Sequence, residues 1–220
     1  MENIVIIGSG GHAKVIIDIV EKAGLYHIVG LLNKSPKKNK KILGYDLLGK
    51  EEDLPKFVKT HAIKGIIIAV GDNFTREKVV EIAKEKCPEI VFFSAIHPNA
   101  SIAPDVSIGQ GTVIMAGVSI NATSSIGEFC ILNTNSSLDH DSQMADFSSL
   151  APGVTVGGEC QIGAYSAINI GATLVPRITI GKHSVIGAGS LVNKPVGSFK
   201  VVYGSPAKKI RERKEGEKYL

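Results

Sequence analysis

The stretch Ile96–Leu132 reads IHPNASIAPDVSIGQGTVIMAGVSINATSSIGEFCIL, and an aliphatic residue recurs in it at every sixth position. The spacing continues without insertion to Val192 and gives seventeen aliphatic residues in one register: Ile96, Ile102, Ile108, Ile114, Ile120, Ile126, Leu132, Leu138, Met144, Leu150, Val156, Ile162, Ile168, Leu174, Ile180, Ile186 and Val192. A period of six fits neither an α-helix nor the alternation of a plain strand. It is typical of a β-helix in which three short strands make one coil.

The residue four places after each aliphatic one is usually small or β-branched: Ala100, Val106, Thr112, Val118, Ser124, Cys130, Ser136, Ser142, Ser148, Val154, Cys160, Ser166 and Ala172. We expect each six-residue unit to form one side of a triangular prism, with its aliphatic side chain inward and its small residue near a corner. Coils stack at the strand spacing of about 4.8 Å, so residues eighteen apart should lie above one another. A β-sandwich with chance periodicity is the alternative.

Glycines follow the same eighteen-residue spacing. Gly109, Gly127, Gly163 and Gly181 share one register, and Ala145 fills the gap between them. We expect these glycines to supply the unusual backbone angles of a tight corner.

The residues before this repeat alternate between strand and helix patterns. Apolar runs predict strands at 3–8, 27–32, 65–70 and 90–93, and helical spacing predicts helices at 13–24 and about 76–86, the second capped by Asn73 or Thr75. Alternation of this kind predicts a small Rossmann-like parallel sheet covered by helices. We therefore expect an α/β domain over residues 1–94 and a β-helix domain over residues 95–220, which ends in a basic helical tail.

A glycine-rich turn follows the first predicted strand. Residues 8–13, GSGGHA, match the pattern G-x-G-x-x-A, which lets a phosphate approach the backbone at a helix N-terminus. The unit is short for a full dinucleotide domain, and Asn33 stands where a ribose-binding acid is expected. We therefore favour a mononucleotide or a nucleotide-sugar over NAD. A tight turn without a ligand is the alternative.

His140 is the one histidine in the middle of the repeat, between Asp139 and Asp141. It follows an inward residue by two places and should face outward at a corner. A neighbouring carboxylate raises the basicity of a histidine and fixes its tautomer. Gly158 lies eighteen residues on, where we expect it to leave room for a ligand and to offer a backbone N–H. A surface histidine with acidic neighbours is the alternative.

Composition excludes several classes of function. The net charge of +4 is too weak to indicate a nucleic-acid partner, and no apolar run is long enough to span a bilayer. Two basic clusters, Lys37, Lys38, Lys40, Lys41 and the C-terminal segment AKKIRERKEGEKYL, are typical of solvated faces. The N-terminus lacks a basic leader, and Cys87, Cys130 and Cys160 form no C-x-x-C pair, so we expect reduced thiols in a cytoplasmic protein.

Five segments together resemble the NeuD/PglD-type sugar acyltransferases of the hexapeptide-repeat superfamily, which include sialic acid O-acetyltransferases and nucleotide-linked amino-sugar N-acetyltransferases. The segments are IVIIGSGGHAKVIIDI, AVGDNFTR, the junction that begins IHPNASIAPD, LNTNSSLDHD, and IGAGSLVNKPV with VVYGSPAKKI. The resemblance covers nearly the whole chain. It implies a left-handed β-helix, which the right-handed crossover rule would not have predicted. It also implies a homotrimer with acetyl-CoA between neighbouring prisms and no metal.

The resemblance also implies roles for individual residues. The catalytic histidine of the family matches His140, its acidic partner matches Asp141, and an active-site asparagine matches Asn133. Acetyl-CoA contacts match Gly158, Ile170 and Ala188. Contacts to the nucleotide-sugar match Ser9, Gly10, Gly11, His12, Asn33, Lys34, Asn73 and Arg76. Two positions depart from the family: Ser149 stands where many relatives have a histidine, and Asn33 where many have an aspartate.

The leading hypothesis is an enzyme that transfers acetyl from acetyl-CoA to the amino group of a UDP- or dTDP-linked 4-amino-deoxy-sugar, for surface glycan biosynthesis. His140 would accept the amine proton, and the N–H of Gly158 is a candidate donor to the oxyanion. Two alternatives stay open: O-acetylation of a sialic acid or another sugar hydroxyl, and a non-catalytic nucleotide-sugar-binding β-helix.

Overall fold

The computed structural model describes residues 1–36 and 40–218, so the predicted cluster members Lys37 and Lys38 lie outside the described residues. The chain begins with a six-stranded sheet of order β3-β4-β2-β1-β5-β6, packed against three helices. The elements are β1 (Glu2–Ile7), α1 (Gly11–Ala23), β2 (Tyr26–Leu32), β3 (Lys41–Ile42), β4 (Tyr45–Gly49), η1 (Glu51–Asp53), α2 (Leu54–Thr60), β5 (Gly65–Ile68), α3 (Asn73–Lys86) and β6 (Val91–Phe92). Among the described residues of this sheet, the strand pairs that include β1 or β5 are parallel and the β3–β4 hairpin is antiparallel, which confirms the Rossmann-like interpretation.

Helix α3 begins earlier than the pattern predicted. Asp72 is its N-cap, and the Asp72 Oδ1 atom accepts hydrogen bonds from the backbone N–H and the hydroxyl of Thr75, at 2.9 and 2.6 Å. The predicted caps, Asn73 and Thr75, are instead the first and third residues of the helix. A carboxylate that can reach the third N–H is a strong cap, so it moved the helix start toward the sheet.

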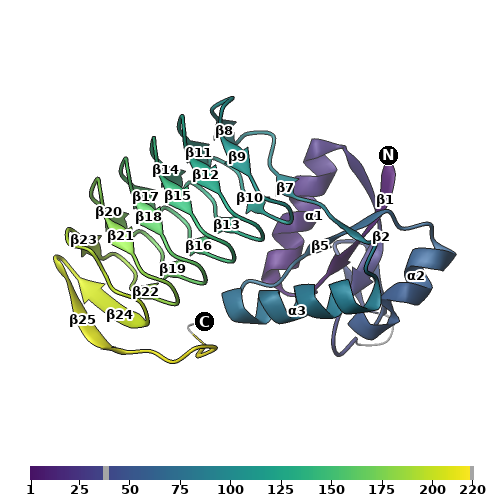
Figure 1. Ribbon diagram of the computed structural model, residues 1–220. Helices are drawn as coiled ribbons and strands as arrows, with labels where there is room; N and C mark the ends of the chain where they lie inside the picture. The colour runs from purple at the N-terminus through teal and green to yellow at the C-terminus, as the bar shows by residue number, and fades with distance from the viewer. Residues whose placement is uncertain (37–39, 219–220) are drawn as a thin grey trace.

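The second part of the chain is a parallel β-helix with three faces (Figure 1). Face 1 contains β7 (Ala95–Ile96), β10 (Val113–Ile114), β13 (Ile131–Leu132), β16 (Ser149–Leu150), β19 (Ala167–Ile168) and β22 (Val185–Ile186). Face 2 contains β8 (Ser101–Ile102), β11 (Ser119–Ile120), β14 (Ser137–Leu138), β17 (Thr155–Val156), β20 (Thr173–Leu174) and β23 (Leu191–Val192). Face 3 contains β9 (Ser107–Ile108), β12 (Ser125–Ile126), β15 (Gln143–Met144), β18 (Gln161–Ile162) and β21 (Thr179–Ile180). We call the edge between faces 1 and 2 edge A, between faces 2 and 3 edge B, and between faces 3 and 1 edge C.

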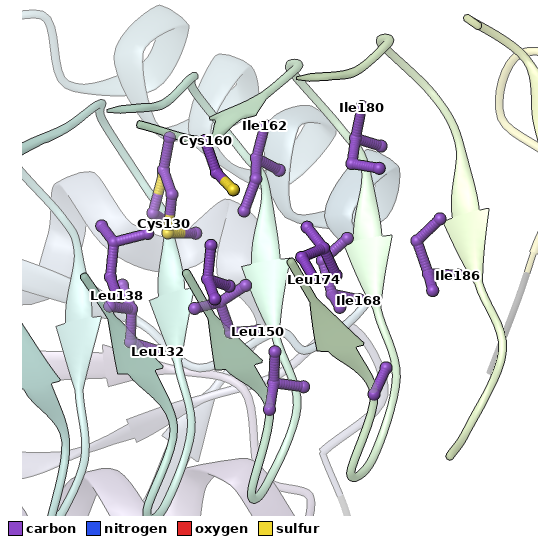
Figure 2. Close-up of a cluster of buried hydrophobic side chains, with 14 of the residues drawn as sticks. Cys130, Leu132, Leu138, Leu150, Cys160, Ile162, Ile168, Leu174, Ile180 and Ile186 are labelled. Atoms are coloured by element: carbon purple, nitrogen blue, oxygen red, sulfur yellow. The ribbon is translucent and has the colours of Figure 1, made fainter. Parts of the chain in front are cut away.

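Strand pairing confirms the eighteen-residue stacking. Ile114 pairs with Leu132, and Leu132 with Leu150, in the same register that every face repeats. The aliphatic side chains form a continuous column inside the prism, with Cys130 and Cys160 beside it (Figure 2). Ile96 is the exception: it lies on the first coil, where no coil covers it, and is exposed. The fold is the left-handed β-helix that the resemblance implied.

The predicted reason for the glycine register was wrong. Gly109, Gly127, Gly163 and Gly181 do not have positive φ angles. A Cβ atom added at Gly109 would lie 2.5 Å from the carbonyl carbon of Gly127, so these positions stay small because the next coil approaches closely. The positive φ angles recur instead at every sixth residue of the repeat, and on edge C they fall two residues after each of these positions. The residues are Gly111, Gly117, Thr123, Phe129, Asn135, Asp141, Phe147, Gly153, Glu159, Tyr165, Gly171, Arg177, His183 and Gly189.

On edge C the left-handed residues that follow Gly111 have aromatic rings. The rings of Phe129, Phe147, Tyr165 and His183 stack in succession with centroids 4.5–5.4 Å apart. Offset stacking at this distance is favourable, by about 0.5–1.5 kcal/mol per pair. The column therefore offsets part of the cost of the left-handed backbone.

The C-terminal segment is a hairpin and not the predicted basic helix. Strand β24 (Lys200–Gly204) pairs with β22 and extends face 1, and β25 (Ala207–Glu212) returns antiparallel to β24. The β-branched pair Val201 and Val202 is buried on the last coil, and Gly204, at φ +105°, begins the reversal. Hydrogen bonding to the unpaired edge of β22 on face 1 thus outweighed the helical tendency of the basic residues.

Arg76 of α3 joins the two parts of the molecule. Its guanidinium is 1% exposed and donates to the carbonyls of Val70 and Gly71 in the α/β part, at 3.0 and 2.9 Å. It also donates to the carbonyls of Phe129 and Phe147 on the coils, at 2.8 and 3.1 Å. One side chain therefore holds α3 against edge C.

The C-terminal segment closes the same interface from the other side. Arg213 is buried and donates to the carbonyl of His183, and Gly216 packs against the ring of Phe74 on α3. The segment around Gly216 accordingly lies beside the start of α3. The N-terminal turn of α3 is thus held both by the coils and by the C-terminal segment.

We expect Arg76→Leu to destabilise the protein strongly. Each buried carbonyl that loses its donor costs about 1–3 kcal/mol. A total loss near 3 kcal/mol would lower the Tm by roughly 6 °C or more in a chain of this size. Thermal unfolding followed by circular dichroism measures the change. The control is Lys86→Leu, which replaces an exposed cation on the same helix; an equal Tm for the two variants would contradict the role of Arg76.

Candidate functional site

A pocket of about 320 Å³ separates the N-terminal end of α1 from face 1 and edge A of the β-helix. Its lining is mostly apolar, with a few polar groups: His12, Val15, Gly71, Met115, Ile131, Asn133, Ser149, Leu150, Ala151, Pro152, Ile168, Asn169 and Ile170. Pockets with this composition are typical binding sites for small molecules. The structure thus brings the predicted residues His12, Asn133 and Ile170 together.

The glycine turn lies beside this pocket at the end of β1. Gly8 has a φ of +121°, and a Cβ there would lie 2.5 Å from the carbonyl oxygen of Ala69, so only glycine fits. A Cβ at Gly10 or Gly11 would meet nothing within 4 Å, which leaves open space over the N-terminus of α1. Strand β1 lies between β2 and β5, so the turn occupies the switch point where α/β sheets bind ligands.

Asn33 interacts with the turn directly. Its Nδ2 donates to the Ser9 hydroxyl at 2.5 Å. A neutral amide at this position keeps negative charge away from the turn, which suits a phosphate. Lys34 is exposed, and its backbone N–H donates to Glu51 at 3.0 Å.

His12 faces the pocket in its neutral form. Burial, with a smaller contribution from the positive charge of Arg76, lowers the pKa of His12 to about 4. Its Nε2 atom is buried and has no hydrogen-bond partner among the described residues. A buried polar atom without a partner is costly, so His12 is suited to bond a ligand.

Asn73 and Arg76 do not line the pocket. Both are 1% exposed, and the Asn73 amide donates to the Ser149 hydroxyl and to the carbonyl of Ser166, each at 3.2 Å. Their polar groups are occupied by contacts between α3 and the coils. Both residues therefore have a structural role between α3 and the coils, and their contact with the substrate stays a prediction.

His140 lies on edge B with the carboxylates predicted around it. Its Nδ1 is 2.7 Å from Asp141 Oδ2, and Thr123 donates to the other carboxylate oxygen at 2.6 Å. The Asp139 carboxylate accepts the backbone N–H of His140 at 2.8 Å. The hydrogen bond to Asp141 is the largest cause that raises the pKa of His140, and the side chain is 53% exposed. With Nδ1–H donated to Asp141, Nε2 remains free to accept a proton.

The space above His140 differs from the prediction. A Cβ at Gly158 would lie 2.6 Å from the Cε1 and Nε2 atoms of the His140 ring. Gly158 therefore leaves room for the imidazole itself, and not for a ligand.

The predicted site residues of the β-helix fall on two of its edges. His140, Asp141 and Gly158 lie on edge B, whereas Asn133, Ile170 and Ala188 lie on edge A, with face 2 between them. One side of six residues spans up to about 20 Å. Within a single chain the two groups of predicted residues therefore lie on different edges of the prism.

Sequence reasoning missed several lining residues. Met115 and Ile131 line the first pocket, and a second one, of about 410 Å³, is lined by Asn169, Ile170, Gly187, Ala188 and Tyr203. Met115 shares its place in the repeat with Asn133 and Asn169, one residue after the inward aliphatic. That register could have identified it.

A left-handed β-helix joined to an α/β unit with an open glycine turn defines the class of hexapeptide-repeat sugar acyltransferases. The PglD N-terminal domain family matches residues 3–83. GDP-perosamine N-acetyltransferase from Caulobacter crescentus, solved as a histidine-to-alanine variant with CoA and GDP-perosamine, superposes with a TM-score of 0.91 at 32% identity, over 96% of this chain and 98% of that one. The chain therefore belongs to the PglD-type acetyltransferases of the hexapeptide-repeat superfamily.

Two further relatives agree with this membership. The acetyltransferase domain of PglB from Neisseria gonorrhoeae FA1090, solved with acetyl coenzyme A, has a TM-score of 0.86 at 29% identity, over 95% of this chain and 99% of that one. UDP-N-acetylbacillosamine N-acetyltransferase of Bacillus subtilis (strain 168) is 34% identical over 125 residues, which are 53% of this chain and about half (52%) of that protein. None of the helices in the described part of the chain has the length and apolar character to cross a membrane.

We expect Asp141→Asn to lower the pKa of His140. The carboxylate stabilises the imidazolium, so its loss makes the ring give up its proton at a lower pH. NMR titration of the His140 ring protons measures the change. The control Glu159→Gln removes a carboxylate on the same edge that is paired with Arg177. A larger shift in the control than in Asp141→Asn would contradict the assigned partner.

Proposed function

We propose that the protein is an acetyltransferase that transfers acetyl from acetyl-CoA to the amino group of a nucleotide-linked 4-amino-deoxy-sugar, in surface glycan biosynthesis. The observation that carries the proposal is the open turn at Gly10 and Gly11, which adjoins a pocket whose other wall is the β-helix. Two of the relatives named above support it, since one is named for UDP-N-acetylbacillosamine and the other was solved with GDP-perosamine.

The nucleotide diphosphate would occupy the turn at Ser9, Gly10 and Gly11, where backbone N–H groups and the helix dipole favour negative charge. The sugar would extend into the pocket. His12 Nε2 supports this direction, because it is a buried polar atom without a partner among the described residues. The apolar side chains of Val15 and Met115 suit the methyl group of a deoxy-sugar.

His140 would act as the general base. The amine nitrogen attacks the thioester carbonyl carbon while Nε2 of His140 takes its proton, and the C–S bond breaks as the tetrahedral intermediate collapses and CoA leaves. Asp141 would hold the ring and stabilise its charged form. The N–H of Gly158 is a candidate donor to the developing oxyanion.

We further infer a homotrimer in the cytoplasm. The separation of edge A from edge B within one chain supports an assembly in which edge B of one copy faces edge A of the next. The free thiols of Cys87, Cys130 and Cys160 support a reducing compartment.

The substrate test is a thiol-release assay with acetyl-CoA and amino sugars linked to UDP, dTDP, GDP or CMP. Thermal shifts with the same panel identify the nucleotide, because a ligand that binds the native state raises the Tm.

Gly10→Val should weaken binding of the nucleotide-sugar, since its side chain fills the space over the α1 N-terminus. Acetyl-CoA binding is the internal control. An equal loss of affinity for the nucleotide-sugar and for acetyl-CoA, in a folded variant, would contradict the assignment of the nucleotide-sugar to the glycine turn.

A complementation experiment tests whether edge B of one copy and edge A of the next form the active site together. His140→Ala should lower kcat by about 10²- to 10⁴-fold, the usual contribution of a general base. Asn133→Ala would remove the proposed active-site asparagine of edge A. Reassembly of the two variants from equal amounts should restore about a quarter of the wild-type turnover, because each mixed ring of three copies contains one intact pair of edges. Activity equal to the sum of the two variants alone would place the site within one copy.

A further inference from the structure

A strained residue lies on edge B, one coil before the turn that carries His140. Thr123 has a φ of +59°, in the left-handed region that favours glycine. Among the described residues with positive φ angles, it is the only one with a β-branched side chain, for which this region is most costly. Strained residues persist where their surroundings fix them, and they gather at functional sites. The contacts of its hydroxyl explain why a threonine occupies this position.

The Thr123 hydroxyl supports the carboxylate that bonds His140. Its Oγ1 atom lies 2.6 Å from Asp141 Oδ1 and 2.7 Å from the carbonyl oxygen of Ala122. That carbonyl already accepts the backbone N–H of Asp141 at 3.0 Å. A hydroxyl donates one proton, and a charged acceptor forms the stronger bond, so the proton goes to the carboxylate. The other oxygen, Oδ2, is left for Nδ1 of His140.

The eighteen-residue register makes this arrangement a column along edge B. Asp105, Thr123 and Asp141 occupy the same position on successive coils, and Asp105 Oδ2 accepts the backbone N–H of Thr123 at 2.8 Å. Because Asp105 holds the turn of Thr123, the hydroxyl has a fixed position from which to bond Asp141. The column therefore connects three coils and ends at the imidazole of His140.

The exposure of the His140–Asp141 pair makes this support necessary. The two side chains are 53% and 55% exposed, so water competes for both. The hydrogen bond from Thr123 is the largest cause that lowers the pKa of Asp141, so it stabilises the charged carboxylate. Exposed ion pairs gain little over hydration, and without the hydroxyl the Asp141 side chain is free to rotate toward water.

We propose that Thr123 is a positioning residue for acetyl transfer: its hydroxyl fixes the Asp141 carboxylate, which in turn holds the His140 ring with Nε2 presented to the amine. The proposal rests on the proposed function, in which His140 is the general base. Thr123 acts through Asp141 and does not touch the substrate. Neither the repeat nor the family resemblance indicated this residue.

The other charges around His140 are unchanged in the variants that test the proposal. Asp139 lies on the same turn, and Glu159, which is paired with Arg177, lies on the next coil. Asp105 lies on the coil before Thr123. A change in the titration of His140 therefore reports on the contact between Thr123 and Asp141.

The first test compares Thr123→Val, which keeps the shape and removes the hydroxyl, with Thr123→Ser, which keeps the hydroxyl. NMR titration should show a lower pKa of His140 in Thr123→Val than in the wild type, because the imidazolium loses its fixed partner. The kcat should fall by about 2- to 12-fold, the usual contribution of one hydrogen bond. Thr123→Ser should restore both values. The matched control is Thr179→Val, which alters an exposed threonine on β21 of face 3.

The pH profile gives a readout that a merely structural role would not move. His140 must be neutral to accept a proton, so activity is lost as the pH falls through its pKa. Since Thr123→Val lowers this pKa, the acidic limb of its kcat profile should move to lower pH. The same limb should stay in place in Thr179→Val.

Thr123→Gly separates the hydroxyl from the backbone strain. Glycine adopts left-handed angles without strain, so this variant should have a Tm no lower than that of Thr123→Val. Its kcat and its His140 pKa should nevertheless match those of Thr123→Val. A wild-type pKa of His140 and a wild-type kcat in either variant would overturn the proposal alone, whereas a wild-type protein that transfers no acetyl group would overturn the proposed function.

Discussion

The close stacking of coils is the constraint on which the rest of the molecule depends. Each strand pairs with the one eighteen residues away, and the backbone of one coil touches glycine in the next at Gly109, Gly127 and Gly163. Because the spacing between strands is fixed near 4.8 Å, every position of the repeat becomes a column along the axis. The aliphatic core, the aromatic column of edge C and the residues that line the pockets along edge A are all columns of this kind.

Columns of this kind explain why so much of the fold could be predicted. The sixfold period determined the inward residues from Ile114 to Val192, and the outward place of His140 beside Asp141 followed from the same count. The turn at Gly8 to Gly11 was predictable because a strand, glycines and a helix pattern follow one another. In each case the signal lay within a few residues or at a constant interval.

Contacts between distant segments were not predictable in this way. Arg76 matched a family position for substrate, yet its guanidinium is occupied by carbonyls that include those of Phe129 and Phe147, far along the chain. Gly158 was expected to admit a ligand, but the space belongs to the His140 ring. The hairpin at residues 200–212 forms because the last coil offers an unpaired strand edge. The basic residues of this segment do not by themselves indicate that such an edge is present.

The fixed register also limits how such a chain can change during evolution. Loss or gain of one residue between Ile96 and Val192 would turn every later side chain onto a wrong position of the repeat, whereas duplication or deletion of a whole eighteen-residue coil would preserve every column. Groove length can therefore vary only in steps of one coil. A lineage of such proteins would therefore lengthen or shorten the prism by complete coils.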